Sequence, residues 1–245
     1  MQEVLIVVPC YNEASRLDVQ EFCDFASTHP RVGFLFVNDG STDPTAQVLE
    51  ELCGTNNACF TFHDLPKNMG KAEAVRAGIL KAFEFKPKYV GMWDADLATP
   101  LREIPRFCEV LDNLPRVGMV FGARVRLMGR TIERPGSRHY LGRLAATLIS
   151  WTIDLPIYDT QCGAKVFRAT EEVAGLFQQP FLSSWIFDVE IITRLIAANN
   201  GVVPPGFLYE LPLNEWKHKG GSRIRSADYV KALWELFLIY RKYLS

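Results

Sequence analysis

The sequence lacks long apolar runs, paired cysteine motifs and an excess of either charge. It carries 27 basic and 28 acidic side chains and a net charge of −1, so no overall field favours nucleic acid as a partner. Its longest apolar segments fall short of the roughly 18 residues that a membrane-spanning helix needs. The six cysteines include no C-x-x-C pair, which argues against a disulfide framework or a zinc site and for reduced thiols. An apolar strand is expected almost directly after Met1, which leaves no room for a signal peptide, so we expect a cytoplasmic protein.

The composition is that of an ordinary globular protein, because 48% of the 245 residues are hydrophobic and 22% are charged. The length suits one sizeable domain, alone or with a small appendage. A G-x-G-x-x-G loop after the first apolar run is also missing, which argues against a dinucleotide-binding Rossmann domain.

The first half of the chain alternates short apolar runs with amphipathic segments. Strands are predicted at residues 4–8, 33–37, 58–63, 89–93 and 117–123, and helices at about 15–26, 43–53, 72–83 and 102–114. This alternation with short links predicts an α/β protein with a doubly wound, mostly parallel sheet and helices on both faces. Ligands of such sheets bind beyond the carboxyl ends of the strands.

Two aspartates stand at the end of the fourth predicted strand, in the sequence YVGMWDADLATP. Asp94 and Asp96 are separated by one small residue, and no basic residue follows them before Pro100. Carboxylates beside a buried strand are usually paired or bind a metal, so the pair suggests Mg²⁺ or Mn²⁺ completed by phosphate oxygens. A turn with a helix cap is the alternative interpretation of this short pattern.

Other polar segments follow the first and second predicted strands and precede the third helix. In these segments Glu13 could hold ribose hydroxyls, Asp39 could accept a hydrogen bond from a base, and Lys71 could reach phosphate. Each residue alone could be a helix cap, a turn residue or a solvated charge. Because the carboxyl ends of parallel strands share one edge, their joint placement predicts a nucleotide-binding crevice.

The segments PCYNE, NDGSTD, NMGKAEAVRAG and DAD, in this order and spacing, resemble the nucleotide-sugar domain of glycosyltransferase family 2, inverting enzymes with the GT-A fold. The later segments DTQCGAKVFR, WIFDVE and NEWKHKGGSRI resemble the polyprenyl-phosphate branch of that family, in particular its dolichyl-phosphate β-glucosyltransferases. The chain departs from the family pattern at Asn38, where an aspartate is usual, and at Ala98, where these enzymes often carry glutamine. The N-terminal membrane anchor of eukaryotic glucosyl members is also not seen.

The resemblance implies a division of labour along the chain. Residues 1–123 would bind the nucleotide sugar, residues 124–226 would form the acceptor-binding and catalytic half of the same domain, and residues 227–245 would form an amphipathic helix. Pro9 and Tyr11 would line the nucleotide pocket. His218 would contact the diphosphate or the metal, although a histidine in a glycine-rich loop is as often merely exposed.

A basic stretch follows the fifth predicted strand, with arginines at positions 124, 126, 130, 134, 138 and 143. Arg134 and Arg138, with Gln161, would bind the phosphate of the acceptor, because the planar guanidinium suits phosphate. A solvated loop explains the same charges equally well.

The reaction implied is transfer of a hexose, glucose from UDP-glucose, to a polyprenyl or dolichyl phosphate with inversion. Asp94 and Asp96 would act through the metal. If the acceptor is instead a saccharide hydroxyl, as in polysaccharide synthesis, attack needs a base, and Asp159 and Asp188 are the candidates. A sugar nucleotidyltransferase and a binding protein with an inactive site are further alternatives.

The C-terminal segment, residues 229–244, has apolar residues at helical spacing with basic residues among them. It could pack on the domain, pack on a second subunit, or lie on the inner face of a membrane beside a lipid acceptor.

Overall fold

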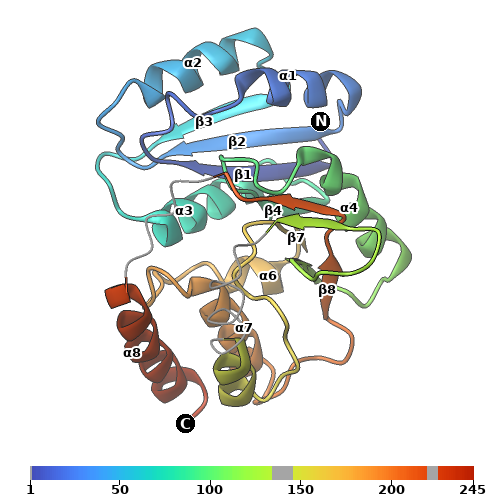
Figure 1. Cartoon of the computed structure of the whole chain (residues 1–245), viewed down its shortest axis with the longest axis vertical. Coiled ribbons are helices and arrows are strands. Elements are labelled where there is room, and N and C mark those ends of the chain that lie inside the picture. Colours follow the sequence, from blue (N-terminus) through green and yellow to red (C-terminus); the bar gives the residue numbers. More distant parts are fainter. Residues whose placement is uncertain (1, 134–145, 220–225) are drawn as a thin grey trace.

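The computed structural model describes residues 2–133, 146–219 and 226–245 and contains a central seven-stranded sheet (Figure 1). The strand order is β3-β2-β1-β4-β7-β5-β8. The strands are β1 (Val4–Cys10), β2 (Val32–Asn38), β3 (Phe60–Asp64), β4 (Tyr89–Met92), β5 (Met119–Ala123), β7 (Lys165–Arg168) and β8 (Leu208–Pro212). Only β7 runs antiparallel to its neighbours β4 and β5. The predicted mostly parallel sheet is therefore confirmed.

Helices cover both faces of this sheet, also as predicted. One face carries α1 (Val19–Thr28), α2 (Thr45–Thr55) and α4 (Ile104–Asn113), and the other carries α3 (Lys71–Glu84), α6 (Glu171–Gly175), α7 (Phe187–Ala198) and α8 (Ser226–Tyr243). Side chains of β1 alternate between the two cores, with Val4 and Ile6 in one and Leu5 and Val7 in the other. Burial on both faces explains why the strand reads as a continuous apolar run.

The predicted start of the first helix was early by four residues. The helix begins at Val19 because the Asp18 side chain accepts a hydrogen bond from the backbone N–H of Glu21, a typical N-cap. The residues before it form a turn in which Arg16 N–H and Leu17 N–H donate to the Glu13 carbonyl. This turn keeps Glu13 beside the carboxyl end of β1.

The C-terminal half adds two features that the sequence did not predict. β7 is inserted between β4 and β5, and a small second sheet pairs β6 (Thr131–Glu133) with β9 (Glu215–Lys217) in parallel. The backbone N–H of Lys217 donates to the Ala98 carbonyl at 2.9 Å. The small sheet is thereby attached to the loop that carries the two aspartates.

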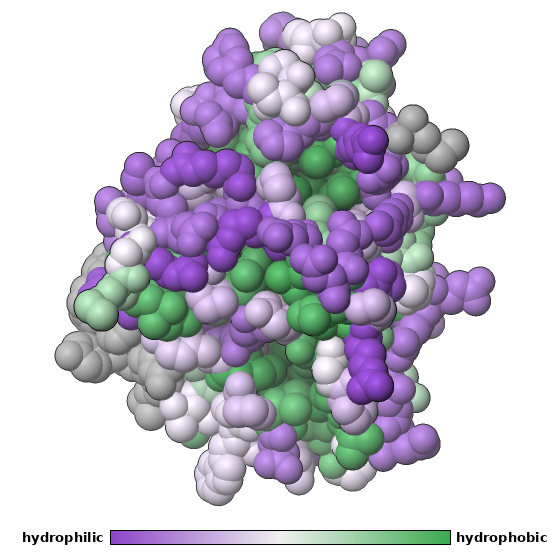
Figure 2. Space-filling model, turned by 90° about the vertical axis from the view of Figure 1, so that its right-hand side faces the viewer, coloured by the Kyte–Doolittle hydropathy of each residue, from purple (hydrophilic) through white to green (hydrophobic). Residues whose placement is uncertain are grey.

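Hydrophilic and hydrophobic residues are unevenly distributed over the molecular surface. Figure 2 shows hydrophilic groups over the upper half of one face and hydrophobic groups gathered between hydrophilic ridges in its middle and lower part. Within the described residues, the helices are all too short or too polar to span a bilayer.

All six cysteines are free, and burial raises the pKa of the Cys53 thiol to about 11.

Candidate active site

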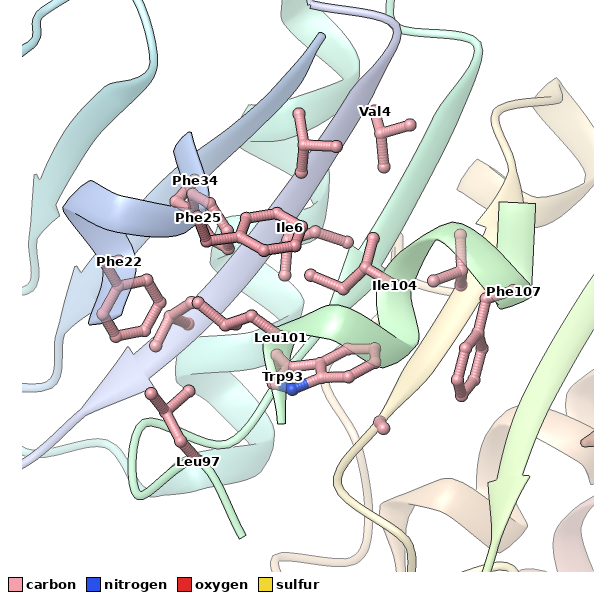
Figure 3. Packing of buried hydrophobic residues seen from close by; sticks show 14 of the residues in the cluster. Val4, Ile6, Phe22, Phe25, Phe34, Trp93, Leu97, Leu101, Ile104 and Phe107 are labelled. Carbon is pink, nitrogen blue, oxygen red and sulfur yellow. The ribbon is translucent and has the colours of Figure 1, made fainter. Parts of the chain in front are cut away.

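The loop that carries the two aspartates is fixed by the buried Trp93. Its indole N–H donates to the Thr99 carbonyl at 2.8 Å, which closes the loop, and its ring packs edge-to-face on Phe107 with centroids 5.3 Å apart. Leu97 in the same loop has φ of 51° and points into this core, as Figure 3 shows. The aspartates therefore project from a segment anchored on both sides.

The two carboxylates differ in their electrostatic surroundings. Asp94 Oδ1 is 2.5 Å from Lys71 Nζ, and Asp96 Oδ1 accepts from the backbone N–H of Ala98 at 2.9 Å. Burial acts to raise the pKa of Asp94, but the positive charges of Lys71, Lys165 and Arg124 outweigh it and hold that pKa below its ordinary value. Burial, and then the negative charge of Asp94, raise the pKa of Asp96.

These residues fit a hard divalent cation that also binds a substrate phosphate. The repulsion between Asp94 and Asp96 is the kind that a cation between them relieves, and Lys71 beside them suits a phosphate. Within the described residues, no group of three or more His, Cys, Asp or Glu side chains is arranged to hold a metal. A two-carboxylate site of this type needs oxygens from the substrate.

The affinity for Mn²⁺ is expected to fall as the pH is lowered, with the loss beginning above pH 3.8, the ordinary pKa of an aspartate. A metal ligand must be deprotonated, and Asp96, whose pKa is raised, takes up a proton before Asp94 does. The affinity should be level above the pKa of Asp96 and drop about tenfold per pH unit below it. Mn²⁺ titrations across this range, with circular dichroism as the control for folding, would measure the change. A level affinity down to about pH 4 would contradict the assignment of Asp96 as a ligand.

Gly163, in the DTQCG segment, lies directly against the Asp94 carboxylate. A Cβ added at this position would be 1.9 Å from Asp94 Oδ2 and 2.1 Å from its carboxyl carbon. Only a residue without a side chain allows so close an approach. The loop that leads into β7 therefore forms one wall of the carboxylate site, a role that the sequence pattern did not reveal.

The loops after β1 and β2 are joined to each other by Asn12, whose φ is 54°. Its backbone N–H donates to Ser41 Oγ at 3.0 Å, and its Oδ1 accepts from the backbone N–H of Thr42 at 2.8 Å. Glu13, which follows, forms a two-point ion pair with Arg16. The charge of Asp96 contributes to the raised pKa of Arg16, although the Glu13 contact is the larger cause. The predicted Glu13 thus pairs with an arginine that lies within electrostatic reach of Asp96.

Asp39 occupies the position predicted to contact the base, but its carboxylate already holds a loop. Its two oxygens accept from the backbone N–H groups of Met69 at 2.6 Å and Gly70 at 2.9 Å, and its exposed fraction is 3%. These bonds place Lys71 at the start of α3. The structure therefore shows Asp39 organising the crevice, and its contact with a base remains a prediction.

Asp188 lies in the first turn of α7 and pairs with the fully buried Lys165. Their charged atoms are 2.7 Å apart, and the Lys165 ammonium also donates to the Cys162 carbonyl. Burial raises the pKa of Asp188 despite Lys165 and Lys71 nearby. Lys165 was not among the predicted site residues, although a single charge in the apolar run GAKVF is a recognisable signal.

Replacing Lys165 with methionine is expected to lower the free energy of unfolding by about 3–5 kcal/mol at neutral pH, since Asp188 would remain buried without a partner. The pKa of Asp188 is raised in the folded protein, so its ionised form destabilises the fold once the pH exceeds the pKa of an aspartate in the unfolded chain. The loss of unfolding free energy in the variant should therefore shrink toward acid pH, where Asp188 is protonated. Denaturant titration at several pH values measures both effects. Lys81→Met, which breaks the exposed pair with Glu84, is the matched control and should change stability little. An equal effect of the two substitutions would contradict the structural importance of the buried pair.

Asp159, the second predicted base, is held by Arg124. The guanidinium donates through Nε at 2.6 Å and Nη2 at 2.7 Å, and the Arg124 backbone N–H donates to the same carboxylate. Glu210 on β8 accepts from the backbone N–H groups of Tyr158 and Asp159. Arg124 belongs to the basic stretch, yet its guanidinium is engaged by the Asp159 carboxylate. Pairing across 35 residues has no local sequence signal.

The other predicted site residues are only partly connected to the crevice. Among the described residues, the buried side-chain Nε2 of Gln161 meets no hydrogen-bond acceptor, which is compatible with a polar ligand. His218 stacks on Trp216 with ring centroids 6.1 Å apart, and within the part of the chain that the structure describes no contact ties it to the aspartates. Pro9 and Tyr11 lie at and just after the end of β1. Arg134 and Arg138 lie outside the described residues.

A separate cleft of about 160 Å³ lies beside the aspartate loop. Leu97, Pro100, Arg102 and Lys217 are among the residues that line it, and neither Asp94 nor Asp96 does. Charges of both signs surround it, including the pair between Arg102 and Glu215. The two carboxylates and Lys71 are therefore not part of this cleft.

Comparison with known proteins identifies the family of this chain. The model of the family "Glycosyl transferase family 2" matches residues 5–173. A dolichyl-phosphate beta-glucosyltransferase of Trichomonas vaginalis is 31% identical over 245 residues, 95% of this chain and 69% of that protein. The protein of the same name from Saccharomyces cerevisiae is 27% identical over 98% of this chain and 74% of its own length.

Two solved structures show the same fold. Glucosyl-3-phosphoglycerate synthase from Mycobacterium tuberculosis, in complex with Mn²⁺, UDP and phosphoglyceric acid, superposes with a TM-score of 0.66 at 16% identity, covering 97% of this chain and 78% of that one. A mannosyltransferase from Pyrobaculum calidifontis, in complex with GDP-Man and Mn²⁺, has a TM-score of 0.62 at 18% identity, covering 98% and 63%. The fold is therefore GT-A. The chain belongs to glycosyltransferase family 2 and is a glycosyltransferase.

Proposed function

We propose that this chain transfers glucose from UDP-glucose to a polyprenyl phosphate, with inversion at the anomeric carbon and with Mg²⁺ or Mn²⁺ as cofactor. The observation that carries the proposal is the cluster of Asp94, Asp96 and Lys71 at the carboxyl edge of the sheet. Relatives named as dolichyl-phosphate beta-glucosyltransferases, aligned over almost the whole chain, support glucose and a polyprenyl phosphate. Solved structures of the same fold with bound Mn²⁺ and UDP support the cofactor and donor.

Each residue of the crevice has a role in this proposal. Asp94 and Asp96 hold the cation, which when bound acts as a Lewis acid on the diphosphate. Lys71 contributes a second positive charge near the leaving group, and Asp39 fixes the loop from which Lys71 projects. Glu13 and Arg16 would bind the nucleoside side of the donor.

The proposed acceptor is already an anion and needs positioning more than a base. A phosphate oxygen forms a bond to the anomeric carbon while the bond from that carbon to the β-phosphate oxygen breaks, and UDP leaves with the electron pair. Asp159 is engaged by Arg124 in a two-point ion pair, so we assign it a positioning role. Gln161, whose amide nitrogen meets no acceptor in residues 2–133, 146–219 and 226–245, would donate to the acceptor phosphate, and Arg134 and Arg138 would provide further positive charge.

A saccharide hydroxyl is the second candidate acceptor, and one observation favours it. Asp188 is buried with a raised pKa and lies within electrostatic reach of Asp94, which suits a group that accepts a proton during attack. The same aspartate would be needed much less for a phosphate acceptor, because no proton leaves the nucleophile. Asp188→Asn should therefore lower the rate of transfer to a saccharide hydroxyl much more than the rate of transfer to a phosphate, and this difference distinguishes the two acceptors.

Labelled UDP-glucose, UDP-galactose and GDP-mannose should be offered with a short-chain polyprenyl phosphate, and separately with a panel of soluble sugars, in the presence of Mn²⁺. The expected result is transfer of glucose from UDP-glucose to the polyprenyl phosphate alone. Transfer only to soluble sugars would overturn the lipid acceptor, and preferred use of another donor would overturn UDP-glucose. Pyrophosphate release from UTP and a sugar phosphate would indicate a nucleotidyltransferase instead.

We also propose the division of labour expected from the sequence, with residues 1–123 binding the donor and residues 124–226 binding the acceptor. It is supported by the origin of the site residues, since Lys71 and Asp94 come from the first segment and Asp159 and Asp188 from the second. Strands of both segments share one sheet, which supports their assignment as halves of a single domain.

A further inference from the structure

Helix α8 packs against α7 in a fixed orientation (Figure 1). Ile239 is fully buried in the core beneath it. The buried Glu235 accepts from Ser183 Oγ at 2.5 Å, and Tyr243 OH donates to Glu190 of α7 at 3.1 Å. Because these contacts lie on one side of α8, they determine which side faces outward.

The outward side of α8 is apolar and aromatic. Leu233, Trp234, Phe237 and Tyr240 are 55%, 61%, 46% and 43% exposed. Residues 233, 237 and 240 recur at spacings of four and three and so form one stripe, and the Trp234 ring lies 5.5 Å from that of Phe237. We name these four residues the α8 stripe. So many large apolar groups on one exposed helix face usually mark an interaction site.

The charges around the α8 stripe favour an anionic partner. Lys231, Arg241 and Lys242 are exposed on the same helix. The only acidic residue from position 231 to the end of the sequence is Glu235, which is buried against Ser183. Lys231 lies 3.7 Å from Glu235, and the exposed charges of Arg241 and Lys242 at the end of the helix are positive. An apolar and aromatic stripe flanked by basic residues is the pattern of helices that lie in the interface of an anionic bilayer.

Hydrogen bonds also link helix α8, which carries the α8 stripe, to the candidate active site. Ser183 Oγ, which donates to Glu235, accepts from the backbone N–H of Ile186 at 2.7 Å. Ile186 caps α7, whose first turn contains Asp188. A surface bound by the α8 stripe would therefore lie at a fixed position relative to Asp188, on the acceptor side of the site.

We propose that the α8 stripe binds the surface of a bilayer containing anionic lipids, and so brings the acceptor side of the crevice to a membrane. The inference rests on the proposed function in one respect, because a polyprenyl phosphate is itself a membrane component. Trp and Tyr side chains are well suited to the headgroup level of a bilayer.

Sedimentation with phosphatidylcholine vesicles, with and without phosphatidylglycerol, tests the inference. The full chain is expected to bind the anionic vesicles at least about tenfold more tightly than the neutral ones, and less tightly as salt increases. Trp234→Ser combined with Phe237→Ser should reduce binding to anionic vesicles at least about tenfold, since both apolar anchors are lost. Val202→Ser changes a residue that is 62% exposed after α7 and serves as the matched control, with binding unchanged.

Equal binding by the double variant and the unchanged chain would overturn the inference, as would no binding to anionic vesicles. So would a stripe-dependent dimer in size-exclusion chromatography without vesicle binding, because a second copy would then cover the stripe. Transfer to a water-soluble, short-chain polyprenyl phosphate is expected to be unchanged in the double variant, while transfer to a vesicle-embedded long-chain acceptor falls. Vesicle binding without transfer to any polyprenyl phosphate would refute the proposed function and leave the membrane inference standing.

Discussion

Replacing Asp96 with asparagine is expected to lower the rate of glucosyl transfer by about a thousandfold or more. Lewis-acid assistance by a metal is worth several kcal/mol, and each 1.36 kcal/mol changes a rate tenfold. The amide keeps the size of the side chain and can still accept from Ala98 N–H, so the loop should remain in place. The loss should therefore come from the missing charge and not from a change of fold.

The measurement pairs turnover with UDP binding in the presence and absence of Mn²⁺. The variant should bind UDP with an affinity that no longer depends on Mn²⁺, while its thermal unfolding is unchanged. Asp24→Asn, on the exposed side of α1, is the control and should have normal activity. Full Mn²⁺-dependent UDP binding by the Asp96 variant would show that the cation is held elsewhere.

Replacing Gly163 with alanine is expected to weaken Mn²⁺ binding about 10- to 100-fold, the range found when groups that orient a metal ligand are disturbed. The added Cβ would lie 1.9 Å from Asp94 Oδ2, so one of the two must move. The backbone around Gly163 cannot shift freely because Cys162 and Ala164 are both fully buried. Asp94 must therefore rotate, which also disturbs its contact with Lys71.

Titration of Mn²⁺ in the presence of UDP, which supplies the phosphate oxygens but no sugar, measures this effect without turnover. Gly175→Ala is the matched control, because a Cβ there meets nothing within 4 Å. The Gly163 variant should keep its fold and regain part of its activity at high Mn²⁺ concentration. An unchanged Mn²⁺ affinity would mean that the Asp94 carboxylate does not bind the metal from its position against Gly163.

The first 123 residues could be interpreted from sequence because their structure follows local rules. Apolar runs such as that of β1 and amphipathic helices such as α3 have distinct periodicities, and each polar segment follows directly after a strand. The parallel sheet then brings Glu13, Asp39 and Asp94 to one edge. The predicted crevice needed only this topological rule, since chain order and strand direction fix which loops meet.

The second half could not be derived in the same way because it depends on contacts between distant residues. β7 is short and antiparallel, and its place between β4 and β5 is fixed by pairing with strands far along the chain. Arg124 was grouped with the loop arginines, yet it binds Asp159. Gly163 gave no signal, since its importance comes from the carboxylate that lies against it.

The most direct test of the account is the affinity of the chain for UDP-glucose with Mn²⁺ and, separately, with a chelator, measured for the unchanged chain and for Asp94→Asn. Asp94, Asp96 and Lys71 are proposed to form one site for a metal-bound diphosphate. We therefore expect tight binding that requires both Mn²⁺ and Asp94. Binding that is equally tight with chelator, or in the Asp94 variant, would contradict that site.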